Sequence, residues 1–275
     1  MSKFTLCAFA DEASDSLTGQ IDAMRENGVT MLELRSVDGE NVSIISSAKA
    51  KEIRKKLDTA GIQVWSIGSP SGKIGIKDDF GPHLDQFRHM VELAEILGAF
   101  HYRLFSFYGC EGASARDTVL ERLSRFVEAA AGSGLVLCHE NEREIYGEKA
   151  PQCLDIHCSI PEIKAVFDPS NFIQAGQPTL EAWDILEPYV EYMHVKDAYS
   201  DGTVVPAGEG DGNLPELLRR YAKIGGKVLS LEPHLAVFSG FSGLGRNAVP
   251  IKWEYPTQRA AFDTAAQALY KLAEG

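Results

Sequence analysis

Four side chains that could together bind a metal stand at the ends of four successive apolar segments in the second half of the chain. They are Glu140, Asp168, His194 and Glu232. Three carboxylates that converge without a cation repel one another and raise one another's pKa values. A divalent metal removes this repulsion, and three oxygen donors with one imidazole suit Mn²⁺, Mg²⁺, Co²⁺ or Zn²⁺. The four residues therefore predict a site for one divalent metal ion.

Alternation along the apolar segments predicts that these four side chains face the same way. Successive side chains of a strand point to opposite faces, so Glu140 shares a face with Cys138, and Glu232 shares one with Ser230. The opposite faces carry bulky apolar residues, which suit contact with a layer of helices. We therefore expect all four side chains to point to the interior at one end of the molecule.

The elements that must position these residues form a repeating pattern. Eight apolar runs of strand length alternate with segments of helical periodicity. The predicted strands are 4–9, 31–34, 64–67, 101–107, 135–138, 163–167, 190–195 and 228–231. The predicted helical segments are 17–27, 48–60, 84–97, 119–130, 180–186, 214–224 and 258–272.

This repeat predicts an α/β fold, the (β/α)8 TIM barrel, with residues 1–275 in a single domain. In such a barrel the functional residues gather at the C-terminal ends of the strands. A doubly wound open sheet is the alternative, but the first strand runs into Ala10, Asp11 and Glu12 instead of a glycine-rich turn. The chain also lacks the GxxxxGK[ST] pattern of a phosphate-binding loop.

The charge balance limits the partners of the protein. The 275 residues include 27 Lys and Arg and 39 Asp and Glu, for a net charge of −12. This balance disfavours binding to nucleic acid and to anionic membrane surfaces. No run approaches the roughly 18 to 20 apolar residues of a spanning helix, and no secretory signal is apparent. The five cysteines are scattered without a CxxC pair, so we expect free thiols and a cytoplasmic location.

At these residues the chain resembles the sugar phosphate isomerase/epimerase superfamily, which has the xylose isomerase-like TIM barrel. The motifs that carry the resemblance are CHENE around Glu140, FDPSN around Asp168, HVKD from His194, the loop PAGEGDG, and SLEPH around Glu232. The resemblance covers nearly the whole chain and implies that these four residues bind one divalent metal. It further implies that Glu140 and Glu232 are the acid/base groups, and that the protein is a dimer or tetramer.

Three positions depart from the ketose 3-epimerases of this superfamily. Those enzymes carry a Glu, a His and an Arg where this chain has Tyr146, Asn171 and Ser200. The metal ligands therefore match, whereas the residues that hold a ketose do not, which argues against a plain ketose 3-epimerase. Endonuclease IV, another member, needs a His in place of Asn171 and a DxH pair after the seventh strand. Their absence, together with the net charge, argues against a DNA substrate.

We therefore expect a metal-dependent sugar isomerase or epimerase that transfers protons through a cis-enediolate, with Glu140 and Glu232 as the acid/base groups. Its substrate would be a sugar or polyol with a carbonyl next to a carbinol. The alternative is a metal-dependent lyase or dehydratase, since the same proton abstraction permits β-elimination on a keto-inositol or 3-keto-glycoside. A non-catalytic sugar-binding barrel is a third hypothesis, against which the complete metal set argues.

Further side chains near the predicted strand ends are candidates to bind the substrate: Lys196, His234, Arg35, Tyr146 and Lys73. Lys196 and His234 each lie two residues beyond a predicted ligand, on the same strand face. Arg103, on the fourth strand, is expected to form a structural ion pair instead of contacting the substrate. Trp253 follows the last strand and could cover the site or contact a neighbouring subunit.

Overall fold

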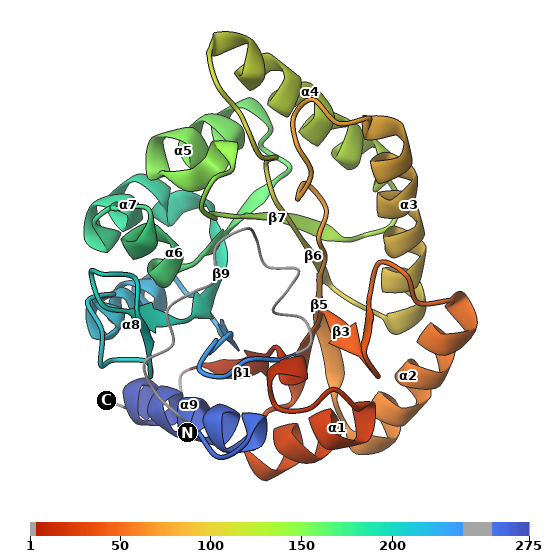
Figure 1. Cartoon of the computed structure of the whole chain (residues 1–275), viewed down its shortest axis with the longest axis vertical. Helices are drawn as coiled ribbons and strands as arrows, with labels where there is room; N and C mark the ends of the chain where they lie inside the picture. The colour runs from red at the N-terminus through yellow and green to blue at the C-terminus, as the bar shows by residue number, and fades with distance from the viewer. Residues whose placement is uncertain (1–3, 239–254, 275) are drawn as a thin grey trace.

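Eight parallel strands close into a barrel, and helices surround it (Figure 1). The computed structural model describes residues 4–238 and 255–274. Around the barrel the strands follow the order β1, β12, β9, β8, β7, β6, β5, β2. They are β1 Thr5–Ala8, β2 Met31–Leu34, β5 Gln63–Gly68, β6 His101–Leu104, β7 Val136–Glu140, β8 Lys164–Phe167, β9 Val190–Val195 and β12 Val228–Leu231. The predicted (β/α)8 TIM barrel and its eight strands are confirmed.

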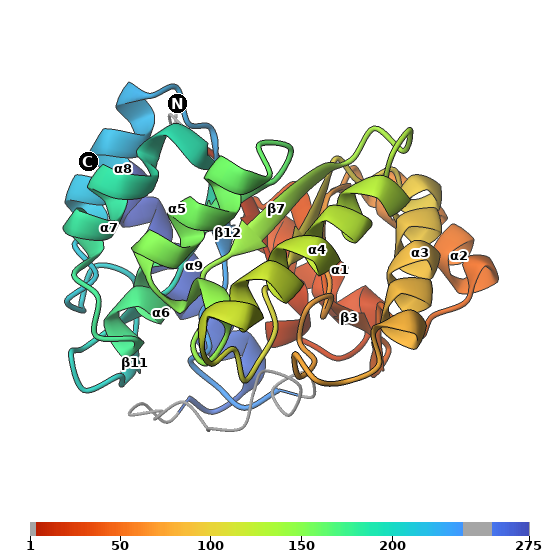
Figure 2. The same cartoon turned by 90° about the horizontal axis from the view of Figure 1, so that it is seen from above.

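The helices form the outer layer, in which α2, α3 and α4 follow one another around the barrel (Figure 2). They are α1 Leu17–Glu26, α2 Ser47–Ala60, α3 Phe80–Leu97, α4 Ala113–Ala129, α5 Ala150–Ser159, α6 Pro169–Gln174, α7 Thr179–Leu186, α8 Leu214–Lys223 and α9 Gln258–Glu274. None of the described helices is long and apolar enough to cross a membrane.

Periodicity predicts seven of these helices but neither α5 nor α6. The buried face of α5 is formed by Ala150, Cys153, Ile156 and His157, so small and polar residues obscure its helical pattern. Helix α6 has only six residues, which is too short for a periodic signal. Trp253, whose role the sequence leaves open, lies outside the described residues.

Local signals set the helix ends. The Ser46 side chain accepts a hydrogen bond from the backbone of Lys49 and caps the start of α2. Gly61 and Gly98 end α2 and α3 in the left-handed conformation, with φ of 72° and 68°. A glycine adopts this conformation at little cost, which is why the predicted helix ends hold at both positions.

Short elements extend the C-terminal ends of several strands. They are the hairpin of β3 Ser36–Val37 with β4 Glu40–Asn41, the hairpin of β10 Asp197–Ala198 with β11 Val204–Val205, and the 3-10 turns η1 Ala10–Glu12 and η2 Tyr146–Glu148. A third 3-10 turn, η3 Glu187–Tyr189, lies between α7 and β9. The hairpins follow β2 and β9, and η1 follows β1. The backbone beyond these strands is therefore ordered and can hold side chains in place.

The alternation of the strands separates two regions of the core. Leu137 and Leu229 belong to the large apolar cluster that contains the buried helix faces. Cys138, Val166 and Tyr192 belong to a small second cluster of the strands. At the C-terminal end of the strands, the interior of the barrel is filled by charged side chains. The predicted ligands stand at this end, and strand parity turns them inward.

Candidate metal centre

The structure brings Glu140, Asp168, His194 and Glu232 together inside the C-terminal end of the barrel. One donor atom from each lies within 4.8 Å of all the others. Each of the four residues is at most 2% exposed. Glu140 ends β7, Asp168 follows β8, His194 belongs to β9 and Glu232 follows β12. Because β7, β8, β9 and β12 are consecutive around the barrel, residues distant in the chain form one cluster.

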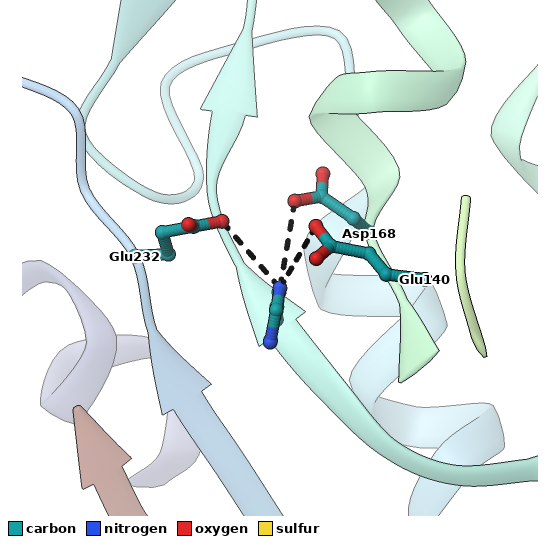
Figure 3. Close-up of side chains that lie close together, drawn as sticks. Glu140, Asp168 and Glu232 are labelled. Carbon is teal, nitrogen blue, oxygen red and sulfur yellow. Dashed lines mark hydrogen bonds and ion pairs between the residues drawn. The ribbon is translucent and has the colours of Figure 1, made fainter. Parts of the chain in front are cut away.

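One imidazole nitrogen lies at the centre of this cluster. Nδ1 of His194 is 3.1 Å from Oε1 of Glu140, 3.4 Å from Oε2 of Glu232 and 3.9 Å from Oδ2 of Asp168. Figure 3 shows the three carboxylates turned toward this nitrogen from different sides. The arrangement offers three oxygen atoms and one nitrogen atom to a common point.

Asp168 is oriented by its own helix. Its Oδ1 accepts a hydrogen bond of 2.9 Å from the backbone of Asn171 and so caps the start of α6. Its Oδ2 accepts no hydrogen bond of good geometry and points into the cluster. Nζ of Lys196, 2.9 Å away, is the cation that faces this oxygen. The donor set of three carboxylates and one imidazole, with an Oδ2 that accepts no hydrogen bond, fits a divalent metal.

The electrostatics of the cluster also fit a divalent cation. Burial raises the pKa of Asp168 to about 7, although Lys196 opposes this effect. Burial also acts on Glu140, but His194 and Arg103 outweigh it and lower the pKa of that carboxyl to about 2. The pKa of Glu232 is lowered well below its ordinary value, since Lys196 and His234 outweigh burial. Carboxylates this close differ in their readiness to ionise, and a dication would favour ionisation of all three.

A family model described as the xylose isomerase-like TIM barrel matches residues 21–248 of the sequence. The chain belongs to this family. The resemblance expected from the motifs is therefore confirmed. Among curated proteins, the sequence finds no match.

Solved structures share the fold of this xylose isomerase-like barrel over nearly the whole chain. D-psicose 3-epimerase with D-tagatose from Clostridium cellulolyticum H10 is 13% identical, with a TM-score of 0.76 over 98% of this chain and 99% of that chain. The IOLI protein with a bound zinc atom is 16% identical, with a TM-score of 0.75 over 98% of both chains. The probable 3-DHS dehydratase AsbF from Bacillus anthracis is 16% identical, with a TM-score of 0.74 over 98% and 99%. At these identities the likeness establishes the fold.

Three of the five predicted substrate-binding residues of this xylose isomerase-like barrel contact the cluster at Glu232, namely Lys196, His234 and Arg35. Nζ of Lys196 lies 3.2 Å from Oε2 of Glu232. Nε2 of His234 lies 3.4 Å from Oε1 of Glu232 and 3.5 Å from Oε1 of Glu12. The backbone of His234 has a φ of 48°, and its N–H donates to Glu12 over 2.7 Å. Glu12 therefore fixes this strained turn.

Arg35 reaches the cluster from β2. Its guanidinium lies 2.9 Å from Oε1 of Glu232, makes two contacts of 2.9 Å with Asp11 and lies 3.1 Å from Oε1 of Glu12. Glu12, Glu232 and His234 could by their spacing hold an ion as well. Arg35 already brings a positive charge to Oε1 of both glutamates, so this second group is a poor site for a metal.

Arg103 forms the predicted ion pair, and its partners are carboxylates of the predicted ligand set. Nη1 of Arg103 lies 3.1 Å from Oε2 of Glu140 and 3.8 Å from Oε1 of Glu232. In the register of the sheet Arg103 is paired with Cys138, two residues before Glu140. The long guanidinium side chain spans this offset, so Arg103 lies closer to the site than its place in the strand indicates.

The last two predicted residues, Lys73 and Tyr146, contact other partners. Nζ of Lys73 lies 3.2 Å from Oε2 of Glu142 and packs over the ring of Phe105. The hydroxyl of Tyr146 donates a hydrogen bond of 2.6 Å to Asp155 on α5. Neither side chain contacts the four clustered residues in this structure.

Two asparagines that the candidate set lacks form hydrogen bonds with residues of the predicted ligand set. The Nδ2 of Asn171 donates to Oε1 of Glu140 over 3.1 Å. Asn141 exchanges two hydrogen bonds of 2.9 Å with the backbone of Asp168. Asn141 stands in the motif CHENE and Asn171 in the motif FDPSN. Their place beside Glu140 and Asp168 in the sequence is the signal that could have identified them.

Proposed function

We propose that the protein is a divalent-metal-dependent sugar isomerase or epimerase that acts by proton transfer through a cis-enediolate. Glu140, Asp168, His194 and Glu232 would hold the metal. When bound, the metal would act as a Lewis acid on adjacent carbonyl and hydroxyl oxygens of the substrate and acidify the C–H between them. The identity of the ion is left among Mn²⁺, Mg²⁺, Co²⁺ and Zn²⁺, and the zinc of the IOLI protein supports a metal in this fold.

The position of the two glutamates is the observation that carries this proposal. Glu140 reaches the cluster from β7 and Glu232 from β12, and two other strands lie between these strands in the barrel. The carboxylates thus flank the cluster (Figure 3). One carboxylate would remove a proton from a bound sugar, and the other would return a proton to the same or the adjacent carbon.

The surrounding polar side chains suit a substrate with several oxygens. Lys196, His234 and Arg35 all approach Glu232, so we propose that they contact substrate oxygens. We also propose that Lys73 and Tyr146 contact the substrate from the rim of the site. To do so, Lys73 would break its ion pair with Glu142, and Tyr146 would break its hydrogen bond to Asp155. The D-tagatose bound to D-psicose 3-epimerase supports a small sugar or polyol as the partner. We further propose that the enzyme is cytoplasmic and homo-oligomeric.

A lyase that acts by β-elimination on a keto-inositol or 3-keto-glycoside is the second candidate. It uses the same proton abstraction next to a carbonyl. The fold likeness to the probable dehydratase AsbF, at a TM-score of 0.74, favours keeping it beside the isomerase. The two reactions differ in their products, since elimination loses water or an aglycone whereas isomerisation conserves mass.

A product-resolved screen tests both candidates. Ketoses, keto-inositols and 3-keto-glycosides would be incubated with the protein in D2O, with Mn²⁺, Mg²⁺ or Co²⁺ present. An isomerase or epimerase yields an isomeric product, heavier only by the solvent deuterium that it carries at the carbon of proton transfer. A lighter product that lacks water or an aglycone identifies the lyase. Failure to turn over any of these substrate classes would argue for the sugar-binding barrel.

The variant Glu232→Gln tests the role of the second carboxylate. We expect turnover to fall by about 10²- to 10⁴-fold, because the amide cannot exchange a proton with the substrate. Metal content is measured on the same preparation, since Glu232 is also a proposed ligand. The exposed variant Glu26→Gln serves as the control and should keep wild-type turnover. Full turnover by Glu232→Gln with metal still bound would contradict the two-carboxylate scheme.

A further inference from the structure

A fourth carboxylate, Glu33 of β2, lies directly beneath the cluster. It is fully buried, and it contacts residues of strands other than its own. Its Oε1 accepts a hydrogen bond of 2.8 Å from the hydroxyl of Tyr192, and its Oε2 accepts one of 2.7 Å from Ser230. The same Oε2 lies 3.2 Å from Nε2 of His194.

The position of these partners defines a layer below the ligands. Tyr192 precedes His194 by two residues on β9, and Ser230 precedes Glu232 by two residues. Side chains two residues apart share a strand face, so both hydroxyls point into the barrel one step below a proposed ligand. Glu33 binds both hydroxyls and His194, and therefore connects β2 to the two strands that carry these ligands across the interior.

Hydrogen-bond chemistry then decides which nitrogen of His194 keeps its N–H when the other binds a metal. An ionised carboxylate only accepts hydrogen bonds, so the contact from Nε2 of His194 to Glu33 requires a proton on Nε2. Nδ1 in turn lies 3.1 Å from Oε1 of Glu140, so each ring nitrogen faces a carboxylate in this structure. A metal held by the three carboxylates would bind the lone pair of Nδ1 in place of a proton there, while Nε2 keeps its N–H toward Glu33. Nδ1 is the atom that faces Glu140, Asp168 and Glu232.

We infer that Glu33 is a positioning residue that holds His194 in the Nε2–H form and thereby presents Nδ1 to the divalent metal. This inference rests on the proposed metal site and adds an outer carboxylate to it. Partners of this kind fix the orientation of a ligating imidazole, and their loss weakens metal binding by about 10- to 100-fold. Glu33 would not contact the substrate.

The variant Glu33→Gln tests the inference with the metal alone. Glutamine has nearly the same shape, but its amide can donate to Nε2 of His194 and thereby move the imidazole proton to Nδ1. Protein stripped with chelator is titrated with Zn²⁺ and with Mn²⁺ by calorimetry. We expect the Kd of the variant to be weakened about 10- to 100-fold, with little change in the melting temperature of the metal-free protein.

The chain offers a matched control in the pair of Glu191 and His101. Oε1 of Glu191 lies 3.0 Å from Nε2 of His101, which is a similar contact at the opposite end of the barrel. Glu191→Gln should leave the Kd for both metals unchanged. A Kd for Glu33→Gln within twofold of the wild-type value would overturn the inference while leaving the metal site in place.

A measurement on the wild-type protein keeps the inference testable if Glu33→Gln does not fold. In the zinc-loaded protein labelled with ¹⁵N-histidine, the ring proton of His194 should be on Nε2, as seen in two-bond ¹H–¹⁵N correlations. A proton on Nδ1 would overturn the inference. If the wild-type protein binds neither Zn²⁺ nor Mn²⁺, the proposed function fails first, and the role of Glu33 fails with it.

Discussion

The charge of Lys196 acts on two carboxylates of the cluster at once. Its Nζ lies 2.9 Å from Oδ2 of Asp168 and 3.2 Å from Oε2 of Glu232. These are the same two oxygens that face Nδ1 of His194. The ammonium therefore stabilises the carboxylates and competes with any divalent cation for the same atoms.

The variant Lys196→Met should separate these two effects. We expect its Kd for Zn²⁺ to tighten by about tenfold, because a competing charge is removed from the two oxygens. Turnover should fall at the same time, since the proposed contact to the substrate is lost. Calorimetry and the substrate assay measure the two quantities. Lys164→Met, at a lysine whose Nζ donates to the carbonyl of Pro161, is the control. Weaker zinc binding by Lys196→Met would refute the competition.

At the level of elements, one buried carboxylate organises the segment that follows β9. Oδ2 of Asp197 accepts hydrogen bonds from the backbone of Gly208 and Gly210, and Oδ1 accepts from Gly212 and Ala198, over 2.9 to 3.1 Å. A Cβ atom at Gly210 or Gly212 would overlap Oδ1. Gly210 and Gly212 of the PAGEGDG loop are therefore required by the close approach of their backbone to Asp197.

The variant Asp197→Asn should destabilise the protein despite its nearly identical shape. The amide has one acceptor oxygen instead of two, so its NH2 group would face backbone N–H groups that are then unpaired. We expect the free energy of unfolding to fall by about 3 kcal/mol, as measured by urea denaturation. The exposed variant Asp117→Asn is the control and should stay within about 0.5 kcal/mol of wild type. An equally small change in Asp197→Asn would show that the loop does not depend on this carboxylate.

At the level of the whole molecule, the cluster connects four consecutive strands of the barrel. The unfolded chain cannot bring Glu140, Asp168, His194 and Glu232 together, because they are spread over 93 positions from the first to the last. A metal that binds only the native barrel must therefore stabilise it by mass action.

Removal and return of the metal should change the melting temperature accordingly. At a free concentration about 100 times Kd, Zn²⁺ or Mn²⁺ should add about 2.7 kcal/mol to the free energy of unfolding. For a chain of this size this corresponds to a rise of about 5 °C over the chelator-treated protein in a thermal scan. Asp168→Asn should abolish most of the shift, whereas the exposed Asp184→Asn should keep it. A shift of the same size in Asp168→Asn would place the binding elsewhere.

Local chemistry made much of the site predictable. Successive side chains of a strand alternate between its two faces, and this alternation can be followed from neighbouring residues. The inward direction of Glu140 and Glu232 therefore follows from the sequence. The helix ends at Gly61 and Gly98 are equally local. Helix α5 escapes such reasoning because its buried face mixes Ala, Cys, Ile and His.

The sequence by itself determined the repeat of eight strands, the barrel and the four residues that meet at one end of it. Only the tertiary structure decided which partners those residues have. Glu33 and His194 are 161 positions apart, and Arg35 and Glu232 are 197 apart. Contacts of this range depend on the closure of the barrel and on the register between its strands. No periodicity within a strand encodes either quantity, since both arise from the packing of the eight strands together.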